Sequence, residues 1–329
     1  MKLVNIPDSV IDAFKLYETF FIIPHIEPDG DCIGSALALD AFLRRIGKIC
    51  YLHNLGPFTR KDIKDFAPRF SGRIDSATRA QANKACAVIL DCSTIDRIGD
   101  LAQDIVDLPI VVIDHHSAGK TFGNFQFINP TAPATSLLVQ QLIEVQGYQV
   151  TKTEAELIMF AFCTDTGYFR HLESGSGEAF RLVSRLVDAG ASPKAIHAQL
   201  NSGAALIGRQ HLGMLLSRTE SLAGGKLLLT WETQSETAAV GRINRDSDLL
   251  YQLLLGVEGV EVVAVLREED TRSVTAGLRS RNSVDVGAVA LEMGGGGHIR
   301  ASGFLANLSL SETREKLLPL LLREIANNC

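Results

Sequence analysis

The sequence predicts an α/β protein of two domains, a doubly wound and mostly parallel sheet followed by a smaller α/β domain. Three observations predict this class. Short apolar runs alternate with helical patterns in the first half, two of these runs end in aspartate, and 329 residues exceed the usual size of one core. We expect a first domain at 1–190, a helical linker at 191–220 and a second domain at 221–329.

Four segments of the first domain are expected to form parallel strands. The strand candidates are Phe20–Pro24, Ile49–Leu52, Ala85–Asp91 and Ile110–Asp114. The last two are short and wholly apolar until their final aspartate, which is typical of strands buried on both faces.

Helices are expected between and after these strands. Apolar residues at three- and four-residue spacing predict a helix over Ile33–Ile46 that stops at Gly47. Thr151–Glu154 has the pattern of a capping box for a helix that runs towards Asp165. Ser192–Pro193 marks a further helix start in the linker.

The second domain is expected to combine a strand, a hairpin and a final helix. The strand lies near Lys226–Trp231, and the hairpin joins Glu261–Arg267 to Ser273–Leu278. A glycine run follows, and the last helix begins at about Ser311.

Composition narrows the classes of function. The net charge of −6 and pI of about 5.8 disfavour a protein that holds duplex nucleic acid on a broad basic surface. The six cysteines include no Cys-x-x-Cys pair, so neither a disulfide framework nor a zinc ribbon is expected. No apolar run reaches the ~18 residues of a membrane span, and no export signal is visible, so we expect a cytoplasmic protein without a membrane partner.

Histidine and aspartate residues gather where predicted elements end. They follow the first strand, close the third and fourth strands, and end one helix; they are His25, Asp29, Asp31, Asp91, Asp114, His115, His116 and Asp165. In an open parallel sheet, loops at the carboxyl ends of the strands converge on one site. We expect Gly30 and Gly34 to form a tight turn there.

Crowded carboxylates need positive charge between them, and a pair of divalent cations supplies it. Two such ions about 3.5–4 Å apart activate a shared water and neutralise charge on a phosphoryl group. Oxygen ligands with some imidazole suit Mn²⁺, with Mg²⁺ or Co²⁺ as alternatives. Three cysteines near these residues, Cys32, Cys92 and Cys163, are expected to be small buried thiols. The sequence therefore predicts a dinuclear metal site that hydrolyses phosphate esters.

Three motifs carry a family resemblance. They are H-x-x-P-D-G-D-x-x-G-S at His25–Ser35, the triplet Asp114–His116, and Gly294–His298 followed by Ala301–Gly303. With these motifs the chain resembles the DHH phosphoesterase superfamily over nearly its whole length. More narrowly, it resembles the bacterial subgroup with a DHHA1 domain, the nanoRNase A-like oligoribonucleases and pAp (3′-phosphoadenosine-5′-phosphate) phosphatases.

The resemblance implies a role for each site residue. One metal would be held by His25, Asp29 and Asp91, and the other by Asp31, Asp91, His115 and Asp165. Asp91 would thus bridge the metals, the hydroxide between them would be the nucleophile, and His116 would stabilise the transition state. For the substrate, the resemblance implies contacts with Arg279, Ser280, Arg281, Gly295, Gly296, Gly297 and His298.

The residue types in these substrate-binding segments are suited to binding phosphate. Backbone N–H groups of a glycine run can cradle a phosphate, and guanidinium groups bind it through paired hydrogen bonds. The implied design has one domain holding the metals while the other grips the terminal phosphate and base across a cleft. The implied partners are short single-stranded oligoribonucleotides or small nucleotides, and a homodimer is left open.

Three functions follow as hypotheses. The leading one is hydrolysis of short oligoribonucleotides and linear dinucleotides to mononucleotides, with removal of the 3′-phosphate of pAp. The alternatives are hydrolysis of polyphosphate or pyrophosphate at the same metals, and a non-catalytic nucleotide sensor. Two departures from the family pattern, Leu137 and His171–Ser174, flank the expected cleft and leave the preferred substrate open.

Overall fold

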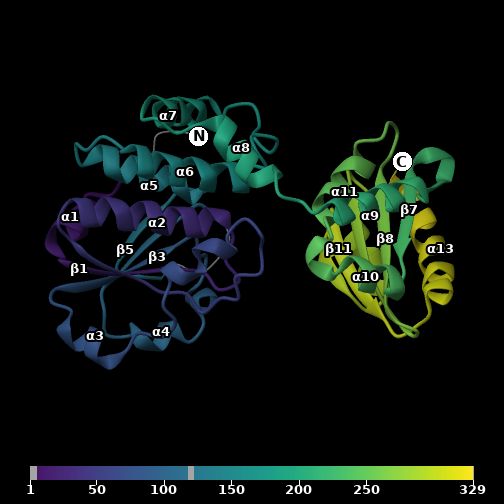
Figure 1. Cartoon of the computed structure of the whole chain (residues 1–329), viewed down its shortest axis with the longest axis horizontal. Helices are drawn as coiled ribbons and strands as arrows, with labels where there is room; N and C mark the ends of the chain where they lie inside the picture. The colour runs from purple at the N-terminus through teal and green to yellow at the C-terminus, as the bar shows by residue number, and fades with distance from the viewer. Residues whose placement is uncertain (1–5, 118–121, 329) are drawn as a thin grey trace. The chain divides into compact units, whose positions relative to one another are not determined.

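A computed structural model describes residues 6–117 and 122–328 of the chain. The chain forms two compact units, Met1–Ser202 and Gly203–Cys329 (Figure 1). The first contains a five-stranded parallel sheet and the second a mixed six-stranded sheet. The α/β class predicted from the sequence is confirmed for both units.

The five-stranded sheet has the order β2-β1-β3-β4-β5. Its strands are β1 (Thr19–Pro24), β2 (Ile49–Leu52), β3 (Ala85–Leu90), β4 (Ile110–Asp114) and β5 (Phe125–Ile128). The four predicted strands are confirmed, and β1 and β3 are buried at every position. β5 was not predicted, because this short edge strand carries Gln126 and is mostly half-buried, so it lacks an apolar run.

Helices cover both faces of this sheet (Figure 1). On one side lie α1 (Asp8–Leu16), α2 (Gly30–Arg45), α5 (Thr135–Val145) and α6 (Lys152–Asp165), with α7 (Gly177–Asp188) and α8 (Pro193–Asn201) stacked beyond them. The other side carries α3 (Ser76–Gln81), α4 (Leu101–Asp104) and the short helix η2 (Ile95–Ile98). A further short helix, η1 (Lys64–Arg69), follows β2. The doubly wound arrangement predicted from the sequence is thus present.

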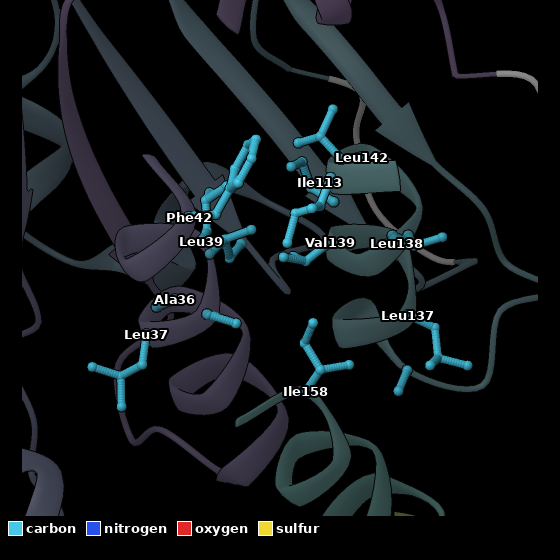
Figure 2. Close-up of a cluster of buried hydrophobic side chains, with 14 of the residues drawn as sticks. Ala36, Leu37, Leu39, Phe42, Ile113, Leu137, Leu138, Val139, Leu142 and Ile158 are labelled. Carbon is cyan, nitrogen blue, oxygen red and sulfur yellow. The ribbon is translucent and has the colours of Figure 1, made fainter. Parts of the chain in front are cut away.

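The core of the first unit lies between α2, α5, α6 and the sheet. Figure 2 shows Phe42 and Leu39 of α2 directed towards Val139 and Leu142 of α5, all fully buried. Burial of such side chains contributes about 1.5–3 kcal/mol each relative to exposure. This packing fixes the helices whose ends carry the aspartates.

Glycines set the distance between α2 and α6. A Cβ atom at Gly34 would lie 2.7 Å from the Cβ of Ala161, and one at Gly30 would lie 2.4 Å from Oγ1 of Thr164. The expected tight turn at these glycines is therefore wrong: both lie within α2 and allow α6 to approach closely. The start of α2 is thereby held against the end of α6, next to Asp165.

The six-stranded sheet of the second unit has the order β10-β11-β9-β8-β7-β6. Its strands are β6 (Glu220–Leu222), β7 (Leu227–Glu232), β8 (Val262–Asp270), β9 (Ser273–Ser280), β10 (Gly296–His298) and β11 (Ala301–Ala306). Only the β7–β8 pair is parallel within the described residues. The predicted hairpin is β8–β9, and the predicted glycine run ends in the edge strand β10.

Two groups of helices pack on this sheet through separate apolar clusters. They are α9 (Leu206–Ser217) and α11 (Ser247–Leu255) in one cluster, and α12 (Val286–Glu292) and α13 (Leu310–Asn328) in the other. α10 (Gln234–Val240) and two short turns, η3 (Ala223–Gly225) and η4 (Arg242–Asn244), complete the unit. Among the described residues, no helix has both the length and the apolar character that crossing a membrane requires.

Candidate metal centre

The first contributors follow β1. His25 is buried directly after the strand, and Asp29 is the N-cap of α2, where its Oδ1 accepts the backbone N–H of Cys32 at 3.1 Å. This cap starts α2 at Gly30, three residues before the predicted start, and buries Asp31 in the first turn. Capping thus places two aspartates at the carboxyl end of the sheet.

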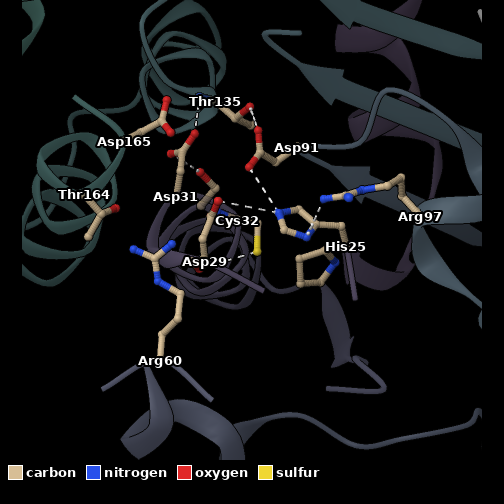
Figure 3. Close-up of polar contacts among 12 residues, drawn as sticks. His25, Asp29, Asp31, Cys32, Arg60, Asp91, Arg97, Thr135, Thr164 and Asp165 are labelled. Atoms are coloured by element: carbon tan, nitrogen blue, oxygen red, sulfur yellow. Dashed lines mark hydrogen bonds and ion pairs between the residues drawn. The ribbon is translucent and has the colours of Figure 1, made fainter. Parts of the chain in front are cut away.

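Asp91 lies between two imidazoles. Its Oδ2 is 3.7 Å from Nε2 of His25, and its Oδ1 is 3.4 Å from Nε2 of His115. The backbone of Asp91 has φ of 59°, an unusual conformation for a non-glycine residue, and its N–H donates to Ile113 O of β4 at 3.0 Å. This turn at the end of β3 leaves the carboxylate facing His25, as Figure 3 shows, and also within reach of His115.

Both histidines present the same nitrogen to the centre. Nδ1 of His25 lies 2.8 Å from the carbonyl oxygen of Ile26, and Nδ1 of His115 lies 3.1 Å from that of Ala132. A protonated Nδ1 would donate to each carbonyl and leave Nε2 as a lone-pair ligand, as metal-binding histidines require. Nε2 of His115 is also 3.6 Å from Oδ2 of Asp165, at the end of α6.

Asp31 is held by the start of α5. The backbone N–H groups of Thr135 and Ser136 donate to its two carboxylate oxygens at 2.6 and 3.1 Å. The Thr135 hydroxyl donates to Oδ1 of Asp91 at 2.9 Å. The sequence interpretation missed both residues, because a threonine at a helix start gives no sign of which distant aspartate it contacts.

The carboxylates of the centre crowd one another. Burial raises the pKa of the Asp31 carboxyl well above its ordinary value, and the charges of Asp91, Asp165 and Asp29 raise it further. Burial also raises the pKa of Asp165 to about 6, against the opposing charge of His115. Such a group stays ionised only if positive charge lies among the oxygens, which is what divalent cations provide.

Three groups of donor atoms meet the geometric requirement for an ion, each with all its atoms within 4.8 Å of one another. They are His25, Asp29 and Cys32; Asp31, His115 and Asp165; and Asp91, His115 and His116. The six metal-ligand residues predicted from the sequence therefore lie together. Cys32 is buried as expected, burial raises the pKa of its thiol well above the ordinary value, and its Sγ donates to the backbone carbonyl oxygen of Asp29 at 3.5 Å.

His116 has a different environment from His115. Its Nδ1 lies 2.7 Å from Oδ1 of buried Asp114, which also accepts the His116 backbone N–H at 3.1 Å. The Asp114 carboxylate raises the pKa of His116 and fixes the ring. Because Nδ1 is engaged by Asp114, Nε2 is the nitrogen that can serve a substrate, and the side chain is 47% exposed.

Two arginines were also missed by the sequence interpretation. Nη2 of Arg97, from η2, lies 3.2 Å from Nδ1 of His25, and Arg60 extends towards Asp29 from the loop after β2 (Figure 3). Both occur in segments with no strand-end pattern, so only the folded chain reveals that they border the centre.

Replacing Thr135 with valine is expected to weaken Mn²⁺ binding about 10- to 100-fold, the usual cost of removing a partner that orients a metal ligand. The hydroxyl that holds Asp91 is lost, whereas the backbone contact with Asp31 remains. Isothermal titration calorimetry with Mn²⁺ measures the change. Thr135→Ser keeps the hydroxyl and should bind Mn²⁺ nearly as the wild type does; equal losses in both variants would contradict the orienting role.

The residues predicted to bind substrate lie in the second unit. β9 ends with Arg279 and Ser280, β11 pairs with β9 so that Ala301 is opposite Arg279, and β10 pairs His298 with Ala301. Gly296, Gly297 and His298 form the exposed edge strand β10, directly after Gly295. The strand pairing therefore brings the arginine segment and the glycine–histidine segment side by side.

These residues differ in what their side chains can reach. Ser280 is buried, and a guanidinium nitrogen of Arg281 contacts the carbonyl oxygens of Leu255 and Val257 at the end of α11. The Arg279 guanidinium stacks over the ring of Tyr251, 4.6 Å from its centroid. Of this set, Arg281, Gly296, Gly297 and His298 are exposed. Gly295 is half-buried, and its N–H donates to Ala290 O at 2.8 Å.

Comparison with known proteins agrees with this arrangement. The chain matches the N-terminal domain of the DHH family over residues 19–162 and the DHHA1 domain over residues 233–327. It is 30% identical to the bifunctional oligoribonuclease and PAP phosphatase NrnA of Thermus thermophilus, over 96% of this chain and 93% of that one. The chain belongs to the DHH/DHHA1 phosphoesterase family. It is therefore a metal-dependent hydrolase that acts on phosphoester bonds.

Proteins similar to this chain differ in the substrates that their names state. An exopolyphosphatase-related protein of Bacteroides fragilis aligns with a TM-score of 0.81 and 26% identity, covering 99% of both chains. The cyclic-di-AMP phosphodiesterase PdeA of Listeria monocytogenes is 23% identical over 91% of this chain but only 46% of its own length. Family membership therefore establishes metal-dependent hydrolysis of phosphoester bonds but does not identify the substrate.

Proposed function

We propose that this DHH/DHHA1 phosphoesterase hydrolyses short oligoribonucleotides, including linear dinucleotides, to mononucleotides and removes the 3′-phosphate of pAp. The observation that carries the proposal is the position of Asp91, which has one carboxylate oxygen near His25 and the other near His115. A carboxylate so placed suits a ligand shared by two cations. The residues around Asp91 would hold two divalent ions, which when bound would lower the pKa of a shared water and neutralise phosphoryl charge.

The ligand assignment follows from the same distances. His25, Asp29 and Asp91 would hold one ion, and Asp31, Asp91, His115 and Asp165 the other. Carboxylate oxygens outnumber imidazoles among these ligands, which favours Mn²⁺ over Zn²⁺, with Mg²⁺ or Co²⁺ as alternatives. Asp31 and Asp91 are oriented by α5, so the chain itself would fix the spacing of the ions.

The substrate proposal depends on the second unit. The names of relatives that align over nearly their whole length include oligoribonuclease and pAp phosphatase activity. In this chain, the exposed backbone of Gly296 and Gly297 would cradle a substrate phosphate, and His298 would add a donor. Arg279 lies next to this segment through β11 and would add a guanidinium, with Arg281 beside it. A grip on one terminal phosphate would favour very short substrates.

A substrate panel tests the proposal. Purified protein with Mn²⁺ is expected to release mononucleotides from a 5′-phosphorylated diadenylate and phosphate from pAp, and EDTA should stop both reactions. Polyphosphate of matched phosphate content serves as the comparison, because a relative aligned over 99% of its chain is named exopolyphosphatase-related. Release of phosphate from polyphosphate alone would replace the nucleotide proposal with that second function. Tight nucleotide binding without turnover above the EDTA level would favour a sensor.

Replacing His298 with alanine is expected to raise KM for the dinucleotide about tenfold while kcat changes little. The exposed imidazole would bind the substrate away from the reacting atoms, so its loss weakens capture rather than chemistry. Steady-state kinetics of His298→Ala and of the exposed control Lys316→Ala on α13 measure the difference. A fall in kcat at unchanged KM would show that His298 has been assigned the wrong role.

A further inference from the structure

The loop after β2 is tied to the metal-binding loop of the first unit. The buried Asn54 donates from Nδ2 to the carbonyl oxygens of Pro24 at 3.0 Å and His25 at 2.7 Å. The N–H of Glu27 donates to Gly56 O at 3.0 Å. Residues 54–56 are thus fixed to the segment that carries His25, and whatever follows them has a defined position beside the centre.

Arg60 is carried by this loop. Its side chain is 51% exposed and extends towards Asp29 in Figure 3. Nε of Arg60 lies 3.5 Å from Asp62, a distance typical of a weak surface pair. Since a guanidinium has five N–H donors, this contact engages only a small part of its capacity. The far end of the loop is anchored by Ile63, which is fully buried.

The side chain of Arg60 lies on the Asp29 side of the centre (Figure 3). The Asp29 side chain is 31% exposed, so this edge of the centre is partly open to solvent. Arg60 borders the same carboxylates that a phosphate would approach.

The charges around the centre explain why a guanidinium is useful at the position of Arg60. The proposed metal ligands include four aspartates, namely Asp29, Asp31, Asp91 and Asp165. Two divalent cations would balance these four carboxylates, and a substrate phosphate would then add negative charge that the ligand set does not offset. An exposed guanidinium at the edge can offset the repulsion and hold phosphate oxygens by charge-assisted hydrogen bonds.

We propose that Arg60 is a substrate-binding residue that donates hydrogen bonds to a non-bridging oxygen of the phosphate under attack, on the Asp29 side of the centre. This inference rests on the proposed metal ligands, not on the choice of nucleotide. Because the contact is made to the phosphate itself, Arg60 contributes equally to substrates with and without a base. His298 of the second unit has no part in this contact.

The test compares Arg60→Gln with Arg60→Lys and with the control Arg69→Gln. Arg69 is the last residue of η1. Its side chain is also exposed and carries the same charge as Arg60, but it lies 3.8 Å from the carboxylate of Asp40. The substrates are bis(p-nitrophenyl) phosphate, a diester without a base, and the dinucleotide, both with Mn²⁺. For Arg60→Gln we expect kcat/KM to fall about 30-fold on both substrates, equivalent to about 2 kcal/mol, with partial recovery in Arg60→Lys and no change in Arg69→Gln.

Mn²⁺ titration separates phosphate binding from an effect on the metals. The proposal requires that Arg60→Gln bind Mn²⁺ within about twofold of the wild type. If Arg60→Gln lost as much Mn²⁺ affinity as kcat/KM, Arg60 would be supporting the metal ligand Asp29 rather than binding the phosphate. A change in kcat/KM below about threefold would refute the proposal. The nucleotide preference is judged separately, by which substrates the wild type turns over, so the two ideas can fail independently.

Discussion

Replacing Asp91 with asparagine is expected to reduce kcat at least about 1000-fold with any substrate. Asparagine keeps the size of the side chain and one oxygen but removes the charge, so it cannot balance two cations at once. The oxygens of Asp91 face His25 and His115, and Thr135 holds one of them, so both proposed ion positions depend on this one carboxylate. A 1000-fold loss corresponds to about 4 kcal/mol of barrier.

The measurement is kcat with Mn²⁺ on the dinucleotide, together with the number of Mn²⁺ ions bound per chain. We expect the variant to bind fewer than two ions at concentrations that saturate the wild type. Asp96→Asn, an exposed aspartate on η2 close in sequence, is the control and should behave as the wild type. If Asp91→Asn retained more than about a tenth of the wild-type kcat, a loss of less than 1.4 kcal/mol, the bridging role would be wrong.

The sequence predicts those site residues that lie at the ends of strands and helices. Asp91 and Asp114–His116 follow wholly apolar runs, so their places at one edge of a parallel sheet follow from local pattern. Asp165 ends a helix whose capping box, at Thr151 and Glu154, is present in the structure. These residues were found because each lies where a regular pattern stops.

The groups that orient those residues could not be predicted in the same way. Thr135 contacts Asp31, 104 residues earlier, through its backbone N–H, a group that every residue except proline possesses. Gly30 and Gly34 were read as turn residues, yet their function is to let a helix more than a hundred residues later pack closely. Arg60 and Arg97 are ordinary surface arginines by pattern. Such contacts are tertiary, and spacing along the chain carries no signal for them.

Replacing His116 with glutamine is expected to lower kcat about 100-fold or more while Mn²⁺ binding stays close to that of the wild type. The ring is held by Asp114 through Nδ1, so Nε2 would face the substrate, where it would donate to the phosphate or the leaving oxygen. Hydrogen bonding to Asp114 raises the pKa of His116, so the donating, protonated form persists to higher pH than for an ordinary histidine. Activity should therefore fall as pH rises through this raised pKa.

Loss of the alkaline limb of the pH profile is the decisive measurement, because a purely structural role of His116 would lower kcat without changing that profile. His197→Gln, on the exposed side of α8, is the control and should keep both the wild-type kcat and the alkaline limb of the pH profile. Asp114→Asn should reproduce much of the His116→Gln defect, and the double variant should lose little more, since the pair would act as one unit. If the two losses added fully, or if His116→Gln released Mn²⁺, His116 would be acting on the metals rather than on the phosphate.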